Sequence, residues 1–183
     1  MHEIPLPTVQ GRLWLCGKHV VGPDPEGVLA RTGADTIVCL TERHELNDRY
    51  PDYVTWLNQH HSHRRAVWFP VHDLHAPPFQ TGKVLIDDLV ARLRGGDGLV
   101  VHCAAGIGRA GTTAVAILIR LGETPENALR YVRAHRPMAG PEVGAQQQFV
   151  QMLSDAYATE ACAAESAQQV AHDVQPQAGG QPQ

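Results

Sequence analysis

The residues best suited to chemistry are a cysteine and an arginine on one short glycine-bearing loop, in residues 100–109 (VVHCAAGIGR). The apolar residues before the loop predict a strand, and residues 110–119 (AGTTAVAILI) predict an apolar helix. Backbone N–H groups converge in such a loop, and the positive end of the following helix stabilises a thiolate at Cys103. Arg109 can bind two phosphate oxygens through its planar guanidinium. A thiolate, an anion cradle and a guanidinium together favour phosphoryl transfer to sulfur.

The spacing of this loop is more specific than the cysteine and arginine alone. That pair arises by chance about a quarter of the time in a chain of this composition, so it is weak by itself. Requiring Gly106 and Gly108 as well reduces the chance to on the order of a few per thousand. The alternative without catalysis is a structural cysteine at a strand end beside a glycine-rich turn. The residues expected to bind the substrate phosphate are Ala104, Ala105, Gly106, Ile107, Gly108 and Arg109.

A second group is needed because an alkoxide or phenolate leaves phosphorus readily only when it is protonated as the bond breaks. Asp73 is the candidate acid. It follows a strand-like stretch at 66–71 and precedes Ala-Pro-Pro at 76–78, which predicts a proline-stiffened loop. Once ionised, the same carboxylate could take a proton from water. An N-cap of a nearby helix is the structural alternative. His72 and His75 flank Asp73 and could replace it or tune it.

The sequence at 102–109 (HCAAGIGR) resembles the signature loop of the cysteine-based protein tyrosine and dual-specificity phosphatases, which is His-Cys, five residues, then Arg. The resemblance covers residues 11–153. Residues 41–46 (TERHEL) and 69–74 (FPVHDL) are similar to the kinase-associated dual-specificity branch, which acts on phosphorylated cyclin-dependent kinases. The resemblance implies a phosphotyrosine protein phosphatase-like α/β fold, in which helices flank a central, mostly parallel sheet. It also implies a phosphocysteine intermediate on Cys103, with Asp73 as acid and then base.

His102 is expected to hold the loop and tune the thiol through hydrogen bonds, with a purely structural histidine as the alternative.

The residue after Arg109 departs from the family pattern. Relatives carry Ser or Thr there, and its hydroxyl helps the sulfur leave in the second step, whereas this chain has Ala110. We therefore expect slow hydrolysis of the phosphoenzyme. Thr112 or Thr113 could compensate from the first helical turn.

Residues 140–149 (GPEVGAQQQF) resemble the glutamine-bearing loop of the family. The resemblance places Gln147 at the position of the retained glutamine, as a supporting residue. It places Val143 where tyrosine-specific members hold a water-orienting glutamine, so water positioning would fall more heavily on Asp73. Gln146 and Gln148 are predicted to lie on a solvated helix face.

The uncharged side chains in the loop favour a phosphorylated protein over a polyphosphorylated inositol, since inositide phosphatases of this superfamily carry lysines there. We expect hydrolysis of phosphotyrosine, with phosphoserine and phosphothreonine left open. Two alternatives remain: a phosphopeptide-binding module with weak turnover, and a phosphatase for a non-protein ester. The chemistry needs no cofactor and no metal. The histidines at 60–63 (HHSH) lack a ligand-like spacing and favour a solvated helix end.

The length of 183 residues fits one domain, assigned to 1–158, followed by a frayed or disordered tail at 159–183 that is rich in Ala, Gln, Gly and Pro. The net charge of −4 leaves no electrostatic footprint for nucleic acid. Because no run of 18 apolar residues occurs, we expect no membrane span and a cytoplasmic location. The oligomeric state stays open.

The four cysteines show no paired spacing, which favours a reducing compartment. Cys39 is a candidate resolving partner for an oxidised Cys103. The remaining pattern alternates between strands and helices, as in a sheet covered by helices. Expected strands are 12–16, 35–41, 66–71 and 98–102. Expected helices begin near 25, 50, 81, 108, 124 and the glutamine-rich stretch.

Overall fold

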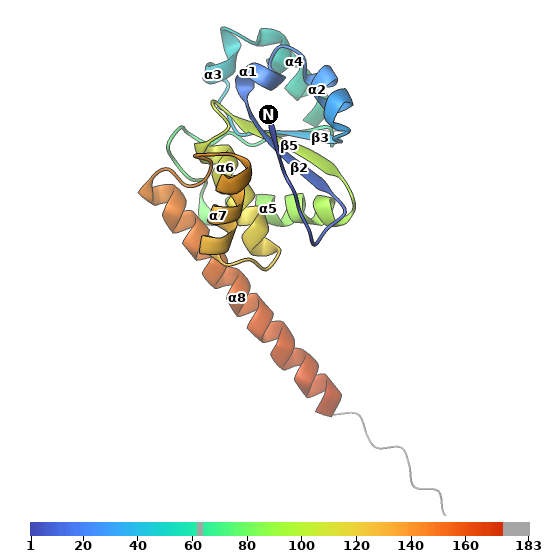
Figure 1. Ribbon diagram of the computed structural model, residues 1–183, viewed down its shortest axis with the longest axis vertical. Helices are drawn as coiled ribbons and strands as arrows, with labels where there is room; N and C mark the ends of the chain where they lie inside the picture. Colours follow the sequence, from blue (N-terminus) through green and yellow to red (C-terminus); the bar gives the residue numbers. More distant parts are fainter. Residues whose placement is uncertain (62–63, 174–183) are drawn as a thin grey trace, which may run out of the picture.

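The chain forms a five-stranded sheet with helices on both faces (Figure 1). This computed structural model describes residues 1–61 and 64–173. The strand order is β1-β2-β5-β3-β4. Strand β1 pairs antiparallel with β2, and the other pairings are parallel, which confirms the mostly parallel sheet. The strands are β1 (His2–Ile4), β2 (Arg12–Gly17), β3 (Thr36–Cys39), β4 (Ala66–Trp68) and β5 (Gly98–Cys103).

The helices divide into two groups that cover opposite faces of the sheet (Figure 1). The first group is α1 (Lys18–Val21), α2 (Pro25–Thr32), α3 (His44–Asn47) and α4 (Pro51–His60). The second group is α5 (Phe79–Arg94), α6 (Gly108–Arg120), α7 (Pro125–His135) and α8 (Gly144–Asp173). Both faces of the central strands are therefore buried, which explains why they lack the hydrophobic-polar alternation of a half-exposed strand.

Strand β5 is buried along its whole length and sends successive side chains to opposite faces. Val101 and Cys103 pack into the core on the side of α5 to α8, whereas Val100 packs on the side of α1 to α4. His102 also faces the side of α1 to α4, where it contacts Tyr53 of α4. The side chains of Cys103 and His102 therefore lie on opposite faces of the sheet.

Local helix signals explain two of the boundaries. Asp24 caps α2 by accepting the Gly27 N–H at 2.8 Å, Pro25 occupies the first turn, and Gly33 ends the helix with a φ of 68°. Thr124 caps α7 in the same way, because its side-chain oxygen accepts the Asn127 N–H at 3.3 Å. The sequence missed β1, α1 and α3. Each is three or four residues long, which is too short to show a hydrophobic period.

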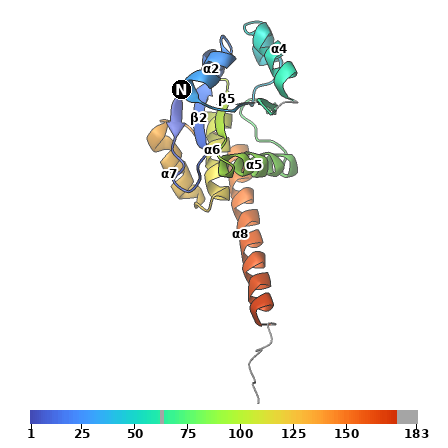
Figure 2. The ribbon, with the colours of Figure 1, turned by 90° about the vertical axis from the view of Figure 1, so that its right-hand side faces the viewer.

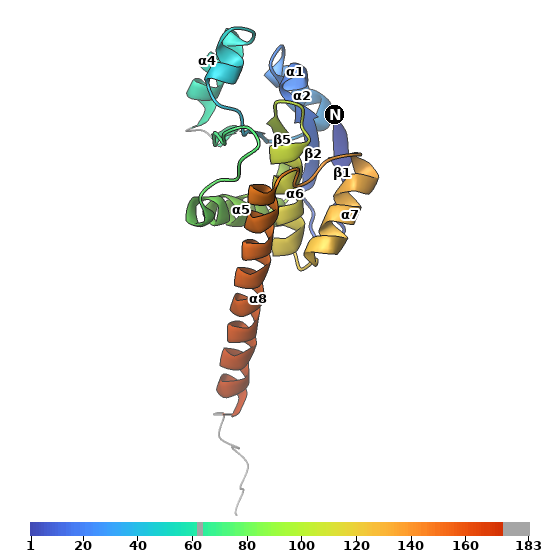
Figure 3. The ribbon, with the colours of Figure 1, turned by 90° about the vertical axis from the view of Figure 1, so that its left-hand side faces the viewer.

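The C-terminal helix α8 differs from the frayed segment expected after 158. It continues through Asp173 and projects from the body of the protein, with residues 158–169 exposed (Figures 2 and 3). Alanine, glutamate and glutamine are strong helix formers, so low apolar content did not prevent helix formation here. The rest of the expected tail, 174–183, lies outside the described residues. Within the described residues, none of the helices has the length and apolarity needed to cross a bilayer.

Candidate active site

The loop that links β5 to α6 surrounds the sulfur of Cys103. Cys103 is buried, and its Sγ accepts the backbone N–H of Gly106 at 3.3 Å. Gly106 has a φ of 75°, and a Cβ there would collide with the backbone carbonyl of Cys16. Glycine is thus required at this position for two reasons, the positive φ and the close approach of strand β2.

Arg136, which follows α7, holds the outer side of this loop. Its Nε donates to the Gly106 carbonyl at 2.5 Å and its Nη2 donates to the Ala105 carbonyl at 2.8 Å. The Ala104 carbonyl accepts the Lys18 N–H at 3.1 Å. A trans peptide points its C=O and the next N–H in opposite directions. Fixing these carbonyls outward therefore aims the following N–H groups toward the inside of the loop.

Arg109, the second residue of α6, is buried beside the loop. Its Nη1 and Nη2 donate to the two carboxylate oxygens of Glu45 at 2.7 and 2.9 Å, and Nη1 also donates to the Val71 carbonyl at 2.8 Å. Its Nε is buried without a protein hydrogen-bond partner among the described residues. An unsatisfied buried donor is unfavourable, and a phosphate oxygen would satisfy it.

The bidentate pair keeps both of its members charged. Burial alone lowers the pKa of Arg109, but the Glu45 carboxylate outweighs this effect and raises the pKa above its ordinary value. Burial likewise raises the pKa of Glu45, and the hydrogen bond from Arg109 reverses the shift to leave it below its usual range. Glu45 reaches the site from α3, and the sequence did not single it out.

Asp73 lies at the mouth of the site. Its Oδ1 is 3.0 Å from Nη2 of Arg109, and its side chain is 64% exposed. Helix α5 begins after Pro78 without a side-chain cap, so Asp73 does not cap it. His72 bonds the Glu42 carboxylate at 2.8 Å, and Nδ1 of His75 lies 2.8 Å from the Asp73 carbonyl. The structure therefore brings Asp73 to Arg109, and the two histidines shape its loop.

His102 is fully buried and lies behind the loop. The Tyr53 hydroxyl lies 2.7 Å from its Nε2, and its Nδ1 lies 3.4 Å from the Cys103 carbonyl. Burial lowers the pKa of His102 to about 4, so its imidazole is neutral at pH 7. Its contact with Cys103 is through the backbone, since the imidazole and the sulfur lie on opposite faces of β5.

Cys39 cannot serve as the resolving partner in this fold. Its Cα pairs in register with that of His102, so its side chain lies on the face opposite Cys103. Burial also raises the pKa of Cys39 to about 11, which disfavours its reactive thiolate. The prediction of a protective disulfide from Cys39 is therefore wrong. The four cysteines are free thiols.

The glutamine-bearing loop is displaced by one residue from the expected alignment. Gln146 is buried, and its Oε1 accepts the Thr112 hydroxyl at 3.3 Å and the Glu142 N–H at 2.8 Å. The prediction that Gln146 lies on a solvated face is wrong. Gln147 is exposed, in a groove between α7 and α8, and does not join the site. The same shift brings Glu142 rather than Val143 against Gly108, in the loop that follows Cys103.

The hydroxyls near Ala110 do not point to the sulfur. Thr112 donates to Gln146, and Thr113 donates to the Arg109 carbonyl at 3.0 Å. Neither therefore compensates for the missing hydroxyl at Ala110, which is itself buried.

His60, the first residue of the histidine run, stacks on Trp56, with ring centroids 4.5 Å apart. Within the residues that the structure describes, no group of three possible metal ligands occurs; His63 lies outside them.

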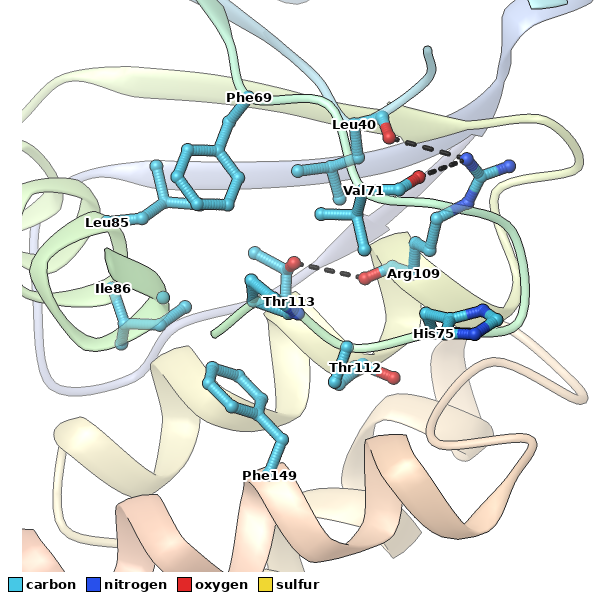
Figure 4. Close-up of a pocket in the computed structure, with 13 residues that line it drawn as sticks. Leu40, Phe69, Val71, His75, Leu85, Ile86, Arg109, Thr112, Thr113 and Phe149 are labelled. Atoms are coloured by element: carbon cyan, nitrogen blue, oxygen red, sulfur yellow. Dashed lines mark hydrogen bonds between the residues drawn. The ribbon is translucent and has the colours of Figure 1, made fainter. Parts of the chain in front are cut away.

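An apolar cavity lies behind Arg109 (Figure 4). Phe69, Leu85, Ile86 and Phe149 wall it, and the Leu40 and Val71 carbonyls reach across its rim to Arg109. Cys103 is not among its lining residues. This cavity therefore lies beneath the arginine and the Asp73 loop and does not include the sulfur.

Solved structures share the fold at low sequence identity. A structure of Tk-PTP in its active form is 22% identical, with a TM-score of 0.59, over 82% of this chain and 99% of that chain. Human DUSP28 is 20% identical, with a TM-score of 0.66, over 87% and 99%. A kinase associated phosphatase whose catalytic-site cysteine is replaced by serine is 21% identical, with a TM-score of 0.65, over 81% and 87%.

The sequence comparisons give the family. A search of curated proteins finds no match. The family model described as "Swiss Army Knife protein, DSP-PTPase phosphatase domain" matches residues 14–177, which include the loop, Arg109 and Asp73. This match confirms the resemblance to the dual-specificity phosphatase superfamily. The chain belongs to the Swiss Army Knife family of DSP-PTPase phosphatase domains.

Proposed function

We propose that the protein hydrolyses phosphotyrosine in protein substrates through a phosphocysteine intermediate. One observation carries the proposal. The Cys103 sulfur lies inside a loop that ends at Arg109, and the same guanidinium contacts Asp73 at 3.0 Å and keeps a buried, unpartnered Nε. This arrangement supports Cys103 as nucleophile, Arg109 as phosphate-binding cation and Asp73 as acid. The phosphatase family and the phosphorylated substrates that it implies agree with this arrangement.

In the first step the Cys103 thiolate attacks phosphorus, the P–S bond forms, and the bond from phosphorus to the substrate oxygen breaks. Asp73, entering as the carboxylic acid, gives its proton to the leaving oxygen. The loop N–H groups and Arg109 bind the equatorial oxygens, and this binding strengthens as charge develops in the transition state. The contacts of Glu45 and the Val71 carbonyl fix the guanidinium in advance, so little reorganisation is needed.

In the second step a water oxygen attacks the phosphocysteine on the side opposite the sulfur. The P–S bond breaks, its electron pair returns to Cys103 as thiolate, and Asp73 takes the proton from water. Inorganic phosphate leaves, and both residues are restored to their starting protonation states. Asp73 is well placed for both transfers because its exposed side chain lies at the mouth of the site.

The substrate class is argued from the loop. The side chains of Ala104, Ala105 and Ile107 carry no charge for a second phosphate, which supports a singly phosphorylated protein side chain. A non-protein ester is the alternative. A structure of PTPMT1 in complex with PI(5)P has the same fold. It is 14% identical in sequence to this chain, with a TM-score of 0.61. Phosphoinositides therefore belong in the substrate panel.

A second candidate function is a phosphopeptide-binding module with weak turnover. Ala110 favours it, because neither Thr112 nor Thr113 supplies the hydroxyl that would assist the sulfur in the second step. Such a module would bind phosphotyrosine peptide at micromolar levels and release no phosphate.

Stopped-flow release of nitrophenolate from para-nitrophenyl phosphate separates these functions, with Cys103→Ser as the control. We expect release that depends on Cys103, with a burst followed by slow turnover. Phosphate release from phosphotyrosine, phosphoserine, phosphothreonine and phosphoinositide substrates then ranks the classes, and we expect phosphotyrosine peptide to be hydrolysed fastest. Binding of the peptide without any Cys103-dependent release would instead assign the binding module.

We infer that residues 1–158 form the phosphatase domain and that the projecting part of α8 is an extension of it. We also place the protein in the cytoplasm, because a thiolate nucleophile among four free cysteines suits a reducing compartment. Limited proteolysis followed by an activity assay tests the boundary at residue 158. A protease-resistant fragment of residues 1–158 that has no phosphatase activity would contradict the proposed domain.

A further inference from the structure

The loop that carries Asp73 has little backbone support of its own. The Val71 N–H donates to the Leu40 carbonyl at 3.0 Å. Beyond it, within the described residues, no backbone–backbone hydrogen bond joins residues 72–77 to another part of the chain. Leu74 has a φ of 60° and is 52% exposed, so it packs against little. The position of Asp73 therefore depends on what the other side chains of the loop contact.

The second half of the loop rests on an apolar support. Residues 75–77 line the cavity behind Arg109. Phe149, which is buried, points into the same cavity from α8 (Figure 4). The His75 carbonyl also accepts a hydrogen bond from Gln146 at 3.3 Å. Apolar packing on α8, together with one long hydrogen bond, thus holds this half of the loop.

The loop and α8 meet at Gly82, in the first turn of α5. A Cβ on Gly82 would lie 2.7 Å from two ring carbons of Phe149 and 2.8 Å from Cγ of Pro77. Gly82 is absent from the positive-φ glycines, so its backbone conformation does not demand glycine. Alanine would favour the helix by up to about 1 kcal/mol. Glycine at this place is therefore explained by the close approach of Phe149 and Pro77.

Helix α8 is a fixed support for the Phe149 ring. Lys83, the residue after Gly82, binds Asp87 at 2.8 Å and Glu160 of α8 at 2.9 Å. The Arg120 Nε of α6 donates to the other carboxylate oxygen of Asp87 at 2.7 Å. These ion pairs join α8 to α5 and α6 about three turns beyond Phe149. The ring is therefore presented by a helix that is fastened to the helices on which the loop lies.

The chemistry makes the exact place of Asp73 important. A general acid must lie within hydrogen-bond reach of the leaving oxygen to give its proton. A displacement of about 1 Å can cost up to about a hundredfold in rate. Resting on the function proposed above, we propose that Phe149 positions Asp73 by supporting Pro77 beneath the loop. Phe149 lies in a cavity that does not include the sulfur, so it is a positioning residue and not a catalytic one.

Two substrates that differ by one nitro group separate placement of the acid from general packing. Phenol, like tyrosine, has a pKa of about 10, so phenolate needs the proton when it leaves. Nitrophenolate is a weaker base and leaves with less help. In Phe149→Leu we expect kcat/KM to fall about tenfold for phenyl phosphate and to stay within about threefold for para-nitrophenyl phosphate. The ratio kcat/KM reports the steps up to departure of the leaving group, so a slow second step does not mask the effect.

Leu153→Ala is the matched control, because it removes a fully buried side chain one turn further along α8, outside the cavity. It should lower the thermal midpoint and slow both substrates equally or not at all. Gly82→Ala should act selectively on phenyl phosphate, because its Cβ meets Phe149 and Pro77. Combining it with Phe149→Leu should restore part of the loss, since the smaller leucine makes room for the methyl group. Asp73→Asn sets the full selective loss, which Phe149→Leu should not enlarge.

Two results would overturn the positioning role. Equal slowing of the two substrates in Phe149→Leu would assign the ring to general packing, and unchanged kinetics for both would remove it from the reaction. Failure of the proposed function looks different. The original protein would then show no Cys103-dependent release from either substrate, or Asp73→Asn would show no selective loss, and the inference would fail with it. A selective loss in Phe149→Leu that is absent from Leu153→Ala supports both.

Discussion

Glu45 and Arg109 form a two-point ion pair, with N–O distances of 2.7 and 2.9 Å, that fixes the guanidinium beside the Cys103 loop. The pair is nearly buried, with 2% of the arginine side chain and 12% of the glutamate side chain exposed. Among the described residues, Nε has no hydrogen-bond partner, and Nη2 also contacts Asp73. We propose that these two groups bind the phosphate, while the contacts with Glu45 position the guanidinium.

Replacing Glu45 by Gln tests that separation. The amide breaks one of the two charged hydrogen bonds, so we expect kcat/KM to fall about tenfold or more. The thermal midpoint should fall as well, because a buried guanidinium loses its counter-charge. Steady-state kinetics and thermal unfolding provide the readouts. Glu42→Gln, which alters a more exposed carboxylate bonded to His72, is the matched control. Equal effects of the two substitutions would contradict the role of Glu45.

Ala110→Ser should accelerate the second step. A hydroxyl donated to the departing sulfur is worth roughly 1.5–3 kcal/mol, which is about one to two decades in rate when fully felt in the transition state. Decay of the phosphoenzyme in a single turnover is the measurement. Ala114→Ser adds the same hydroxyl one turn further along α6, at another buried alanine, and should leave the decay rate unchanged. No gain from Ala110→Ser would show that the hydroxyl is not the missing element.

Arg136→Met should weaken binding of the phosphate group without unfolding the protein. The substitution releases the Ala105 and Gly106 carbonyls, so the loop N–H groups are no longer fixed toward the phosphate. We expect the inhibition constant of inorganic phosphate to rise about tenfold. Two charged hydrogen bonds are lost, and water molecules that bind the released carbonyls replace part of their stabilising effect. Arg133→Met, an exposed position on α7, is the control. An unchanged inhibition constant would assign Arg136 a role outside the site.

His102 should make folding stability depend on pH. Its pKa is about 4 in the folded protein and about 6.5 when unfolded, so the unfolded chain binds the extra proton between these values. Stability therefore falls as pH decreases from 6.5 to 4, by up to about 1.4 kcal/mol per pH unit from this group. Urea unfolding of the original protein and of His102→Asn checks the sign. A slope with pH that is identical in the two proteins would contradict the assignment.

The sequence predicted candidate site residues where they lie close together along the chain, and their catalytic roles stay predictions. Cys103, the loop glycines and Arg109 occupy one strand–loop–helix unit, whose geometry follows from local signals. Asp73 was predicted as the acid because the chemistry demands one and the Pro-Pro pair marks a loop; the structure places it beside Arg109, and its role as acid stays a prediction. The alternating pattern of strands and helices likewise predicted the mostly parallel sheet, since each of these elements is long enough to show its hydrophobic character.

Glu45 and Arg136 could not be found in this way, because their roles depend on distant pairings. Glu45 lies 64 residues from Arg109, and Arg136 lies 30 residues from Gly106, with no spacing that marks either contact. Gln146 was missed for a different reason. Three consecutive glutamines begin α8, and only the helix phase decides which one points inward. A shift of one residue turns a side chain by about 100° on a helix and so exchanges a buried position for an exposed one.

The most direct test is to trap the intermediate itself. The protein is mixed with para-nitrophenyl phosphate, quenched in acid within the burst phase, and digested for mass spectrometry. We expect a phosphoryl group on the peptide that contains Cys103, and we expect it to disappear in Cys103→Ser. A phosphoryl group on another residue, or full nitrophenolate release by Cys103→Ser, would contradict it.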